Sequence, residues 1–243
     1  MFPAMPLYLI PVTLGDTPHE QVLPQFNESI VRNIRHFVVE EIRTARRFLR
    51  RMDPVFPIDD CTFYEMGKHA ASHNDRNQQS PYQEAIRVLA SGTDVGVISE
   101  AGCPAVADPG TDVVLMAQRR GLQVVPLVGP NSMIMAVMAS GLSGQSFAFN
   151  GYLPVDEADR ARRLKALESR AQSEHQTQLF IETPFRNRKM TESLLRTLRP
   201  TTRMCIAAGI TTPDQYIRTM TIAEWRKTLL PDLSKIPAIF LIG

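Results

Sequence analysis

The chain is poor in several features that mark particular classes of protein. Among its 243 residues it has three cysteines and no apolar run that approaches the ~18 residues of a membrane-spanning helix. The first twelve residues, MFPAMPLYLIPV, are too short and too interrupted by proline for a signal peptide. Cys61, Cys103 and Cys205 are far apart and odd in number. This pattern is typical of reduced thiols in a cytoplasmic protein and argues against a disulfide framework or a zinc site.

The chain also lacks a large excess of charge of either sign, and it lacks the common nucleotide-binding motifs. There are 27 Lys and Arg against 25 Asp and Glu, a net charge of +2, so the composition demands no polyanionic partner. The patterns G-x-G-x-x-G and G-x-x-x-x-G-K-[ST] do not occur, which argues against a Rossmann dinucleotide site and a P-loop. His69 and His73 are four residues apart, but no glutamate or third ligand accompanies them, so no metal site is predicted.

The most informative stretch that is present is VGVISEAGCPAVADPG, residues 95–110. Residues 95–99 have the character of a buried strand, and they lead into a loop of glycine, proline and small residues bracketed by Glu100 and Asp108. Open α/β sheets bind their ligands at such strand ends. An ordinary strand-to-helix turn has the same composition, so these residues alone leave both interpretations open.

Strand and helix patterns alternate along the first part of the chain, which predicts a parallel, doubly wound sheet. Ser80 is the expected N-cap of the third helix, and Asn131 or Ser132 that of the last. Strands are expected at residues 7–12, 37–39, 62–65, 95–99 and 123–127, and helices at 29–34, 41–52, 81–91, 112–120 and 133–140.

The Gly/Ser segment 141–145 (GLSGQ) is the expected domain boundary, dividing an N-terminal α/β domain, residues 1–144, from a C-terminal α/β domain, residues 145–243. The pattern at 215–220 alternates like that of an edge strand. Other strands of this domain are expected from Phe147 and at 178–182, 203–208 and 238–242, with helices at 156–173 and 187–198. The first of these helices carries a set of basic side chains: Arg160, Arg162, Arg163, Lys165 and Arg170.

Five segments resemble, in collinear order, signature sequences of one family. They are residues 37–49 (FVVEEIRTARRFL), 95–110, 125–132 (VPLVGPNS), 140–154 (SGLSGQSFAFNGYLP) and 179–186 (LFIETPFR). Residues 95–110, for example, resemble S-D-A-G-[TM]-P-x-[IL]-S-D-P-G. The family is the tetrapyrrole methylase superfamily, the class III S-adenosylmethionine-dependent methyltransferases. Within it, the chain is most similar to the branch of bacterial small-subunit (16S) ribosomal RNA cytidine 2'-O-methyltransferases.

The resemblance implies a two-domain homodimer, with a parallel doubly wound N-terminal sheet and a mixed-sheet α/β C-terminal domain. It also implies that S-adenosylmethionine binds in the cleft between the domains and leaves as S-adenosylhomocysteine, without a metal. The cofactor-binding residues implied by the matching loops are Leu14, Gly15, Ser99, Glu100, Ala101, Gly102, Cys103, Pro104, Ala107, Asp108, Gly129, Pro130, Asn131, Ser132, Thr183, Pro184 and Ala208.

The chain departs from the family at residues that are expected to face the methyl acceptor. The family's T-P-I-G-N-L is residues 12–17 (VTLGDT) here, and its E-D-T-R is residues 40–43 (EEIR). Ile181 and Phe185 replace the Tyr and His of Y-E-S-P-H-R, and residues 207–212 (AAGITT) lack the charges of A-R-E-L-T-K. The resemblance therefore indicates the cofactor more firmly than the acceptor.

Methyl transfer from a sulfonium is an in-line displacement, so the acceptor oxygen must be held in line with the methyl carbon. A ribose hydroxyl is a poor nucleophile, and a carboxylate that acts as a base or orients the hydroxyl would help it. Glu40, Glu100 and Glu182 are the candidates for this carboxylate, and Arg43 and Arg186 the candidates for holding acceptor phosphates. The alternative is that these residues form salt bridges between the domains.

Three functions remain open. The resemblance and the basic helix at 156–173 favour a cytoplasmic methyltransferase that acts on ribosomal RNA or the small ribosomal subunit, with no membrane partner. The departures on the acceptor side leave open a small-molecule methylase of the same superfamily, for example one that acts on a tetrapyrrole. Loss of the family's Arg-Glu pair at Ala208 and Gly209 is the one feature that favours a non-catalytic protein that retains the cofactor site.

Overall fold

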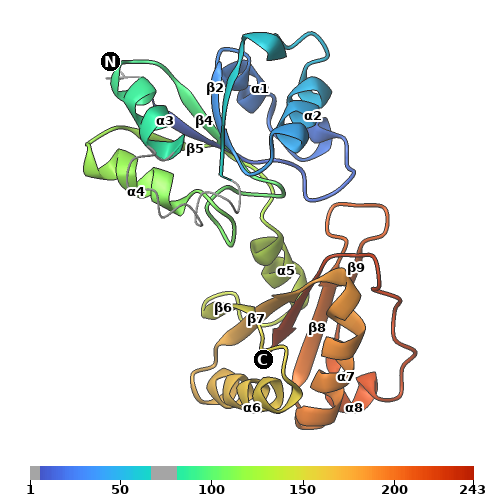
Figure 1. The fold of residues 1–243 in the computed structure, drawn as a ribbon. Helices are drawn as coiled ribbons and strands as arrows, with labels where there is room; N and C mark the ends of the chain where they lie inside the picture. The colour runs from blue at the N-terminus through green and yellow to red at the C-terminus, as the bar shows by residue number, and fades with distance from the viewer. Residues whose placement is uncertain (1–5, 67–80) are drawn as a thin grey trace. The chain divides into compact units, whose positions relative to one another are not determined.

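The computed structural model of the chain describes residues 6–66 and 81–243 (Figure 1). The predictions for His69, His73 and Ser80 therefore lie outside the described residues. Within the described ranges, no helix is both long and apolar enough to cross a membrane. All three cysteines are free thiols.

The chain folds into two compact units, residues 1–130 and 131–243. The boundary expected from the sequence, after residue 144, lies further along the chain. Helix α5 (Ser132–Ser140) accounts for the difference, because it packs on strands of the second unit. Its sequence alone gave no sign of this, since a helix that follows a strand reads as a continuation of the same βα pattern.

The first unit contains a five-stranded sheet in the order β3-β2-β4-β1-β5, in which every neighbouring pair is parallel. This confirms the predicted parallel sheet. The central strand, β4, is buried along its whole length, as a strand covered on both faces requires. The strands are β1 (Leu7–Ile10), β2 (His36–Val39), β3 (Thr62–Glu65), β4 (Val95–Ile98) and β5 (Val124–Pro126).

Helices cover this sheet on both faces, and each face has its own apolar core. Helix α2 (Ile42–Met52) shows why: Ala45, Phe48, Leu49 and Met52 are buried at helical spacing, and the arginines between them face away. The other helices are α1 (Gln25–Val31), α3 (Pro81–Ala90) and α4 (Thr111–Arg119).

The second unit contains a mixed five-stranded sheet in the order β6-β7-β10-β8-β9. Only β6 and β7 are parallel, and the remaining pairs are antiparallel. The mixed sheet implied by the family is thus confirmed, and β9 lies at the edge as its alternation predicted. The strands are β6 (Phe147–Tyr152), β7 (Thr177–Glu182), β8 (Arg203–Ala208), β9 (Tyr216–Thr221) and β10 (Ala238–Ile242).

Helices α6 (Glu157–Ser173), α7 (Asn187–Thr197) and α8 (Ile222–Trp225) pack with this sheet around one core, centred on Phe180, Phe240 and the fully buried Trp225. The short helix α8 was not predicted. It begins with a capping box in which the Thr221 side chain and the Glu224 side chain satisfy each other's backbone N–H groups.

The basic helix α6 is not a continuous cationic surface. Arg160 is 1% exposed, and its guanidinium donates to the Ser193 hydroxyl at 3.0 Å and to the Val155 carbonyl at 2.8 Å. Arg162 and Arg170 form ion pairs with acidic residues on or beside the same helix. The expectation that Arg160 adds to an RNA-binding face is therefore wrong, because its charge holds the start of α6 against α7.

Candidate functional site

Loops that follow β1, β4 and β5 meet at the carboxyl ends of these strands. The Val12 N–H donates to the Gly102 carbonyl at 2.9 Å, and the Ser99 hydroxyl donates to the same oxygen at 2.8 Å. A Cβ on Gly102 would lie 3.0 Å from Leu14 Cδ2 and 3.2 Å from the Pro130 carbonyl oxygen. The structure thus brings together four of the residues predicted to bind the cofactor.

The loop after β4 is held in a backbone conformation that L-residues rarely adopt. Ala105 and Ala107 have φ of 62° and 58°, and Gly102 and Gly110 also have positive φ. A left-handed conformation costs a non-glycine residue about 1–2 kcal/mol. Strain of this kind persists only where the surrounding structure enforces it, and it concentrates at functional sites.

Three carboxyl groups gather beside this loop. Glu40 follows β2 and Glu100 follows the adjacent strand β4, so the parallel register places both at the same edge of the sheet. Asp108 comes from the loop between β4 and α4, and its Oδ2 is buried without a hydrogen-bond donor. Among the described residues, no group of three or more His, Cys, Asp and Glu side chains is arranged to hold a metal ion.

Two of these carboxyl groups, those of Asp108 and Glu100, have raised pKa values. Burial raises the pKa of Asp108 to about 6, and the charge of Glu40 and its hydrogen bond to Asp108 add to the rise. Burial also raises the pKa of Glu100; a hydrogen bond from Thr44 opposes that rise, and the charge of Glu40 adds to it. Two like charges in one partly desolvated place favour a shared proton. Such groups are suited to accepting a proton near neutral pH.

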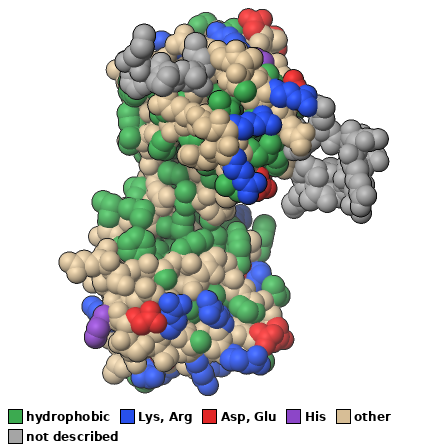
Figure 2. Space-filling model, turned by 90° about the vertical axis from the view of Figure 1, so that its left-hand side faces the viewer, with side chains coloured by type: hydrophobic (Ala, Val, Ile, Leu, Met, Phe, Trp, Pro, Cys, Tyr) green, Lys and Arg blue, Asp and Glu red, His purple; other side chains and the backbone are tan. Residues whose placement is uncertain are grey.

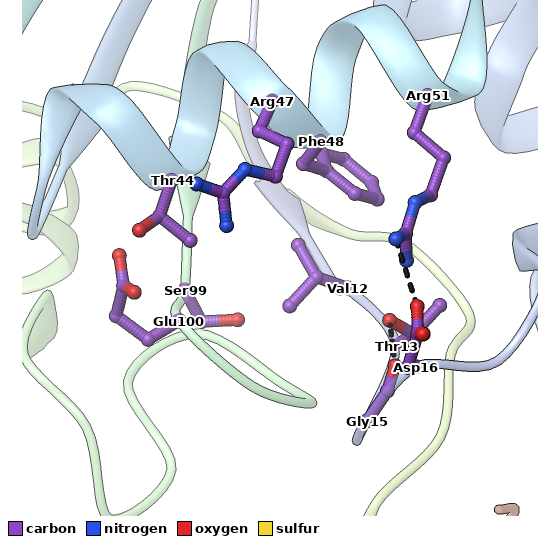
Figure 3. Close-up of a pocket in the computed structure, with 10 residues that line it drawn as sticks. All are labelled: Val12, Thr13, Gly15, Asp16, Thr44, Arg47, Phe48, Arg51, Ser99 and Glu100. Atoms are coloured by element: carbon purple, nitrogen blue, oxygen red, sulfur yellow. Dashed lines mark hydrogen bonds and ion pairs between the residues drawn. The ribbon is translucent and has the colours of Figure 1, made fainter.

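A cavity of about 410 Å³ opens between α2 and the strand-end loops (Figure 3). Glu100 and Thr44 lie at one end of it, and Asp16 and Arg51 lie at the other. Gly15, Ser99 and Glu100 were predicted as site residues. The full lining is Val12, Thr13, Gly15, Asp16, Thr44, Arg47, Phe48, Arg51, Ser99 and Glu100.

The arginines of this cavity were missed by the sequence analysis, which singled out Arg43 instead. Arg43 is exposed and does not line the cavity. Arg47 and Arg51 do line it, from successive turns of α2. The repeat of arginine at every fourth position from Arg43 was the available signal, because such residues share one helix face.

The second unit holds the other predicted catalytic pair. Arg186 Nη2 lies 2.8 Å from Glu182 Oε2, and Glu182 Oε1 accepts from the Thr183 N–H at 2.8 Å. Glu182 is 5% exposed, at the end of β7, and Pro184 begins the 3₁₀ turn that carries Arg186. These two residues therefore form an ion pair within one unit.

The remaining residues predicted to bind the cofactor lie on different elements and differ in burial. Asn131 is the N-cap of α5, as expected: its Oδ1 accepts from the N–H groups of Met133 and Ile134, both at 3.1 Å. Ser132 is the first residue of that helix, and the side chain of Ala208 is buried in the core of the second unit. Ala101, Cys103, Pro104 and Ala107 lie on the loop after β4, and Gly129 on the loop after β5.

The chain is similar in sequence to known proteins of one family. The sequence model described as tetrapyrrole (corrin/porphyrin) methylases matches residues 31–225. Ribosomal RNA small subunit methyltransferase I of Vibrio cholerae is 31% identical over 218 residues, 90% of this chain and 69% of the relative. The proteins of the same name from Pseudomonas aeruginosa and Bacillus subtilis are 30% and 28% identical over 80% and 74% of this chain. The chain spans 55–69% of the length of these three relatives.

Solved structures show the same fold at low identity. The methyltransferase CobJ matches with a TM-score of 0.60 and 16% identity, over 99% of this chain and 94% of CobJ. A uroporphyrin-III C-methyltransferase from Thermus thermophilus, solved with S-adenosylhomocysteine, matches with a TM-score of 0.52 and 17% identity, over 98% of this chain and 97% of its own. The chain belongs to the tetrapyrrole (corrin/porphyrin) methylase family of methyltransferases.

Proposed function

We propose that this protein transfers a methyl group from S-adenosylmethionine to a ribose 2'-hydroxyl of small-subunit ribosomal RNA. The observation that carries the proposal is the edge of the first sheet, where three interlocked loops adjoin a group of carboxyls with raised pKa values. Relatives named as small-subunit ribosomal RNA methyltransferases support the choice of acceptor.

The loops fit the proposed cofactor in one specific respect. Asp108 Oδ2 is buried and lacks a donor, so it is available for the hydroxyl or ammonium groups of S-adenosylmethionine. The loop that contains Gly102 is held by hydrogen bonds from the Val12 N–H and the Ser99 hydroxyl to the Gly102 carbonyl, and a loop held in this way has a lower ordering cost on binding. When bound, the cofactor supplies a methyl group on a positively charged sulfur, and a neutral thioether leaves.

The carboxyls then act on the acceptor. Methylation of the ribose oxygen would release the hydroxyl proton, which a carboxylate beside the loop would accept. Glu40 and Glu100 are the proposed acceptors of this proton, because both follow adjacent strands at the edge of the sheet beside the loop, and burial raises the pKa of Glu100. For Glu182 and Arg186 we propose a supporting role through their ion pair, and for Arg43 a contact with acceptor phosphate.

We further propose that the protein is a cytoplasmic homodimer. Large apolar side chains are exposed on α5 and on the edge strand β6 of the second unit: Ile134, Met138, Phe147 and Phe149. Figure 2 shows hydrophobic side chains gathered on this unit. Contiguous exposed apolar surface is typical of a protein interface. Sedimentation of the purified chain at two concentrations tests this assembly.

Calorimetric titration with S-adenosylmethionine and S-adenosylhomocysteine tests the cofactor. We expect saturable binding of both, and weaker binding by the Asp108→Asn variant. Absence of binding to well-folded protein would overturn the proposal and favour a protein that has lost the cofactor site. Binding with methyl transfer to a tetrapyrrole but not to RNA would reassign the acceptor.

A further inference from the structure

Two arginines on one face of α2 form a cationic wall of the cavity described above. Arg47 and Arg51 are one helical turn apart, about 6 Å along the axis, and both line the cavity (Figure 3). Among the described residues, the Arg47 guanidinium has no hydrogen bond or ion pair. An unpaired arginine beside a polar cavity is a ready site for an anion.

Arg51 does have a partner, and that partner is easily displaced. Its Nη2 lies 2.8 Å from Asp16 Oδ1, and the Asp16 side chain is 92% exposed. Ion pairs exposed to this extent contribute little to stability, so a stronger anion can replace the carboxylate at small cost. Asp16 stands where the related family pattern has asparagine, which makes the pair a feature of this chain.

The end of the cavity away from Arg51 holds a carboxylate, and the Arg47 guanidinium points toward that end (Figure 3). Glu100 lies there beside Thr44, while the floor between the two ends includes the buried Phe48 and Val12 (Figure 3). A ligand that is anionic at one end and has a hydroxyl at the other would be oriented by this arrangement. The volume of about 410 Å³ lies within the range of sites for single small ligands.

We propose that Arg47 and Arg51 bind the phosphate adjacent to the ribose that receives the methyl group. In the absence of RNA, Asp16 forms an ion pair with Arg51, and this phosphate displaces it. The inference rests on the proposed function and sharpens it, because it selects a phosphodiester-linked acceptor. Arginine forms two parallel hydrogen bonds to a phosphate, so the pair would fix the strand as well as attract it. The ribose hydroxyl would then face the carboxyl end of the cavity.

The test compares single variants of α2 in binding and in turnover. We expect Arg47→Ala and Arg51→Ala each to weaken binding of a fluorescent small-subunit ribosomal RNA fragment about 10-fold. Each should also reduce the slope of log affinity against log salt by about 1, while calorimetric binding of S-adenosylmethionine stays unchanged. Asp16→Asn should tighten RNA binding, because it removes the competing carboxylate.

Arg50→Ala is the matched control. Arg50 lies on the same helix, but its guanidinium donates to the Pro54 carbonyl at 2.8 Å and does not line the cavity. Its variant should retain the affinity and the salt slope of the unmodified protein. A drop equal to that of Arg47→Ala would mean that the effect is general electrostatics, which would overturn the site.

The outcomes also separate this inference from the proposed function. If the protein methylates ribosomal RNA while all arginine variants bind RNA normally, the phosphate site is wrong and the function stands. If RNA binding depends on Arg47 and Arg51 but no methyl group is transferred, the site stands and the function fails. A third outcome is that inorganic phosphate binds to Arg47 and Arg51 while a 50-fold excess of phosphate over protein leaves RNA affinity unchanged. This result would assign the arginines to a free anion and overturn the RNA assignment.

Discussion

Each unit of the chain contains charged side chains that are buried or partly buried, and the two sets differ in their hydrogen-bond and charge partners. In the second unit, Arg160 donates from Nε and Nη1 to a hydroxyl and two backbone carbonyls and leaves only its Nη2 without a partner among the described residues, and Glu168 accepts from the Thr202 hydroxyl and the Arg199 N–H. In the first unit, Glu40 and Asp108 face each other as like charges, and one oxygen of Asp108 has no donor.

This difference distinguishes charged groups that stabilise the fold from charged groups that are available to bind a ligand or a proton. A buried ion with most of its hydrogen bonds made, and with no like charge beside it, is expensive to remove and gains little from a ligand. A carboxylate whose ionised form is destabilised by its neighbours is stabilised when it binds a proton or a ligand, so it can act in binding or proton transfer. Substitutions in the second unit and then in the first test this contrast.

The largest effect is expected for Arg160→Ala. The change leaves a void and unpaired backbone carbonyls at the start of α6, so the free energy of unfolding should fall by about 3 kcal/mol. Urea denaturation measures it. Arg162→Ala is the control, since that side chain is 79% exposed and should change stability by about 0.5 kcal/mol or less. Equal effects of the two variants would refute the structural role of Arg160.

The next effect concerns turnover. Glu40→Gln and Glu100→Gln should each lower kcat for methyl transfer about 100-fold, because an amide cannot accept the hydroxyl proton. Affinity for S-adenosylmethionine should change much less. Glu84→Gln removes a carboxylate of the exposed ion pair with Arg87 on α3 and serves as control. Unchanged kcat in both site variants would remove these residues from the mechanism.

Stability should respond to pH through Asp108. Its folded-state pKa is raised from 3.8 to about 6, so the folded protein binds more protons than the unfolded chain between these values, and stability falls as pH rises through this window. Asp108→Asn should therefore raise the free energy of unfolding at pH 8 by on the order of 1 kcal/mol after solvent screening. The gain should shrink towards pH 4. A gain that does not vary with pH would show that the charge is not its cause.

The smallest effect concerns backbone strain. Ala107→Gly removes the Cβ from a residue with φ of 58° and should stabilise the protein by about 0.5–1 kcal/mol, while binding of S-adenosylmethionine weakens as the loop loosens. Ala166→Gly, on an exposed position within α6, should destabilise by a similar amount. Thermal unfolding of both variants checks the opposite signs.

Much of the fold could be predicted from the sequence, because the apolar patterns are strong where the strands are fully buried. The limits of β3, β8 and β10 were predicted to the residue, and α2 to within one. The family signatures identified the loops after β4 and β5, since they depend on glycine and proline at fixed spacing, whereas the loop after β1 departs from the family pattern. The edge position of β9 followed from its alternation.

The missed features depend on tertiary packing. The basic helix gave no sign that Arg160 is buried, because Arg162 and Arg163, two and three residues later, are exposed. The assignment of α5 to the second unit follows from its packing against strands far along the chain. The cavity role of Arg47 and Arg51 required knowledge of which face of α2 lies over the ends of β1 and β4.

Transfer of radiolabelled methyl groups from S-adenosylmethionine to small-subunit ribosomal RNA tests the central claim most directly. A 2'-O-methyl group protects the adjacent phosphodiester from alkali, because the hydroxyl that would attack it is blocked. We expect the label to be recovered in one alkali-resistant dinucleotide, and to be lost with Glu100→Gln. Cofactor binding without any transfer to this RNA, or label in an alkali-sensitive mononucleotide, would contradict a ribose methyltransferase.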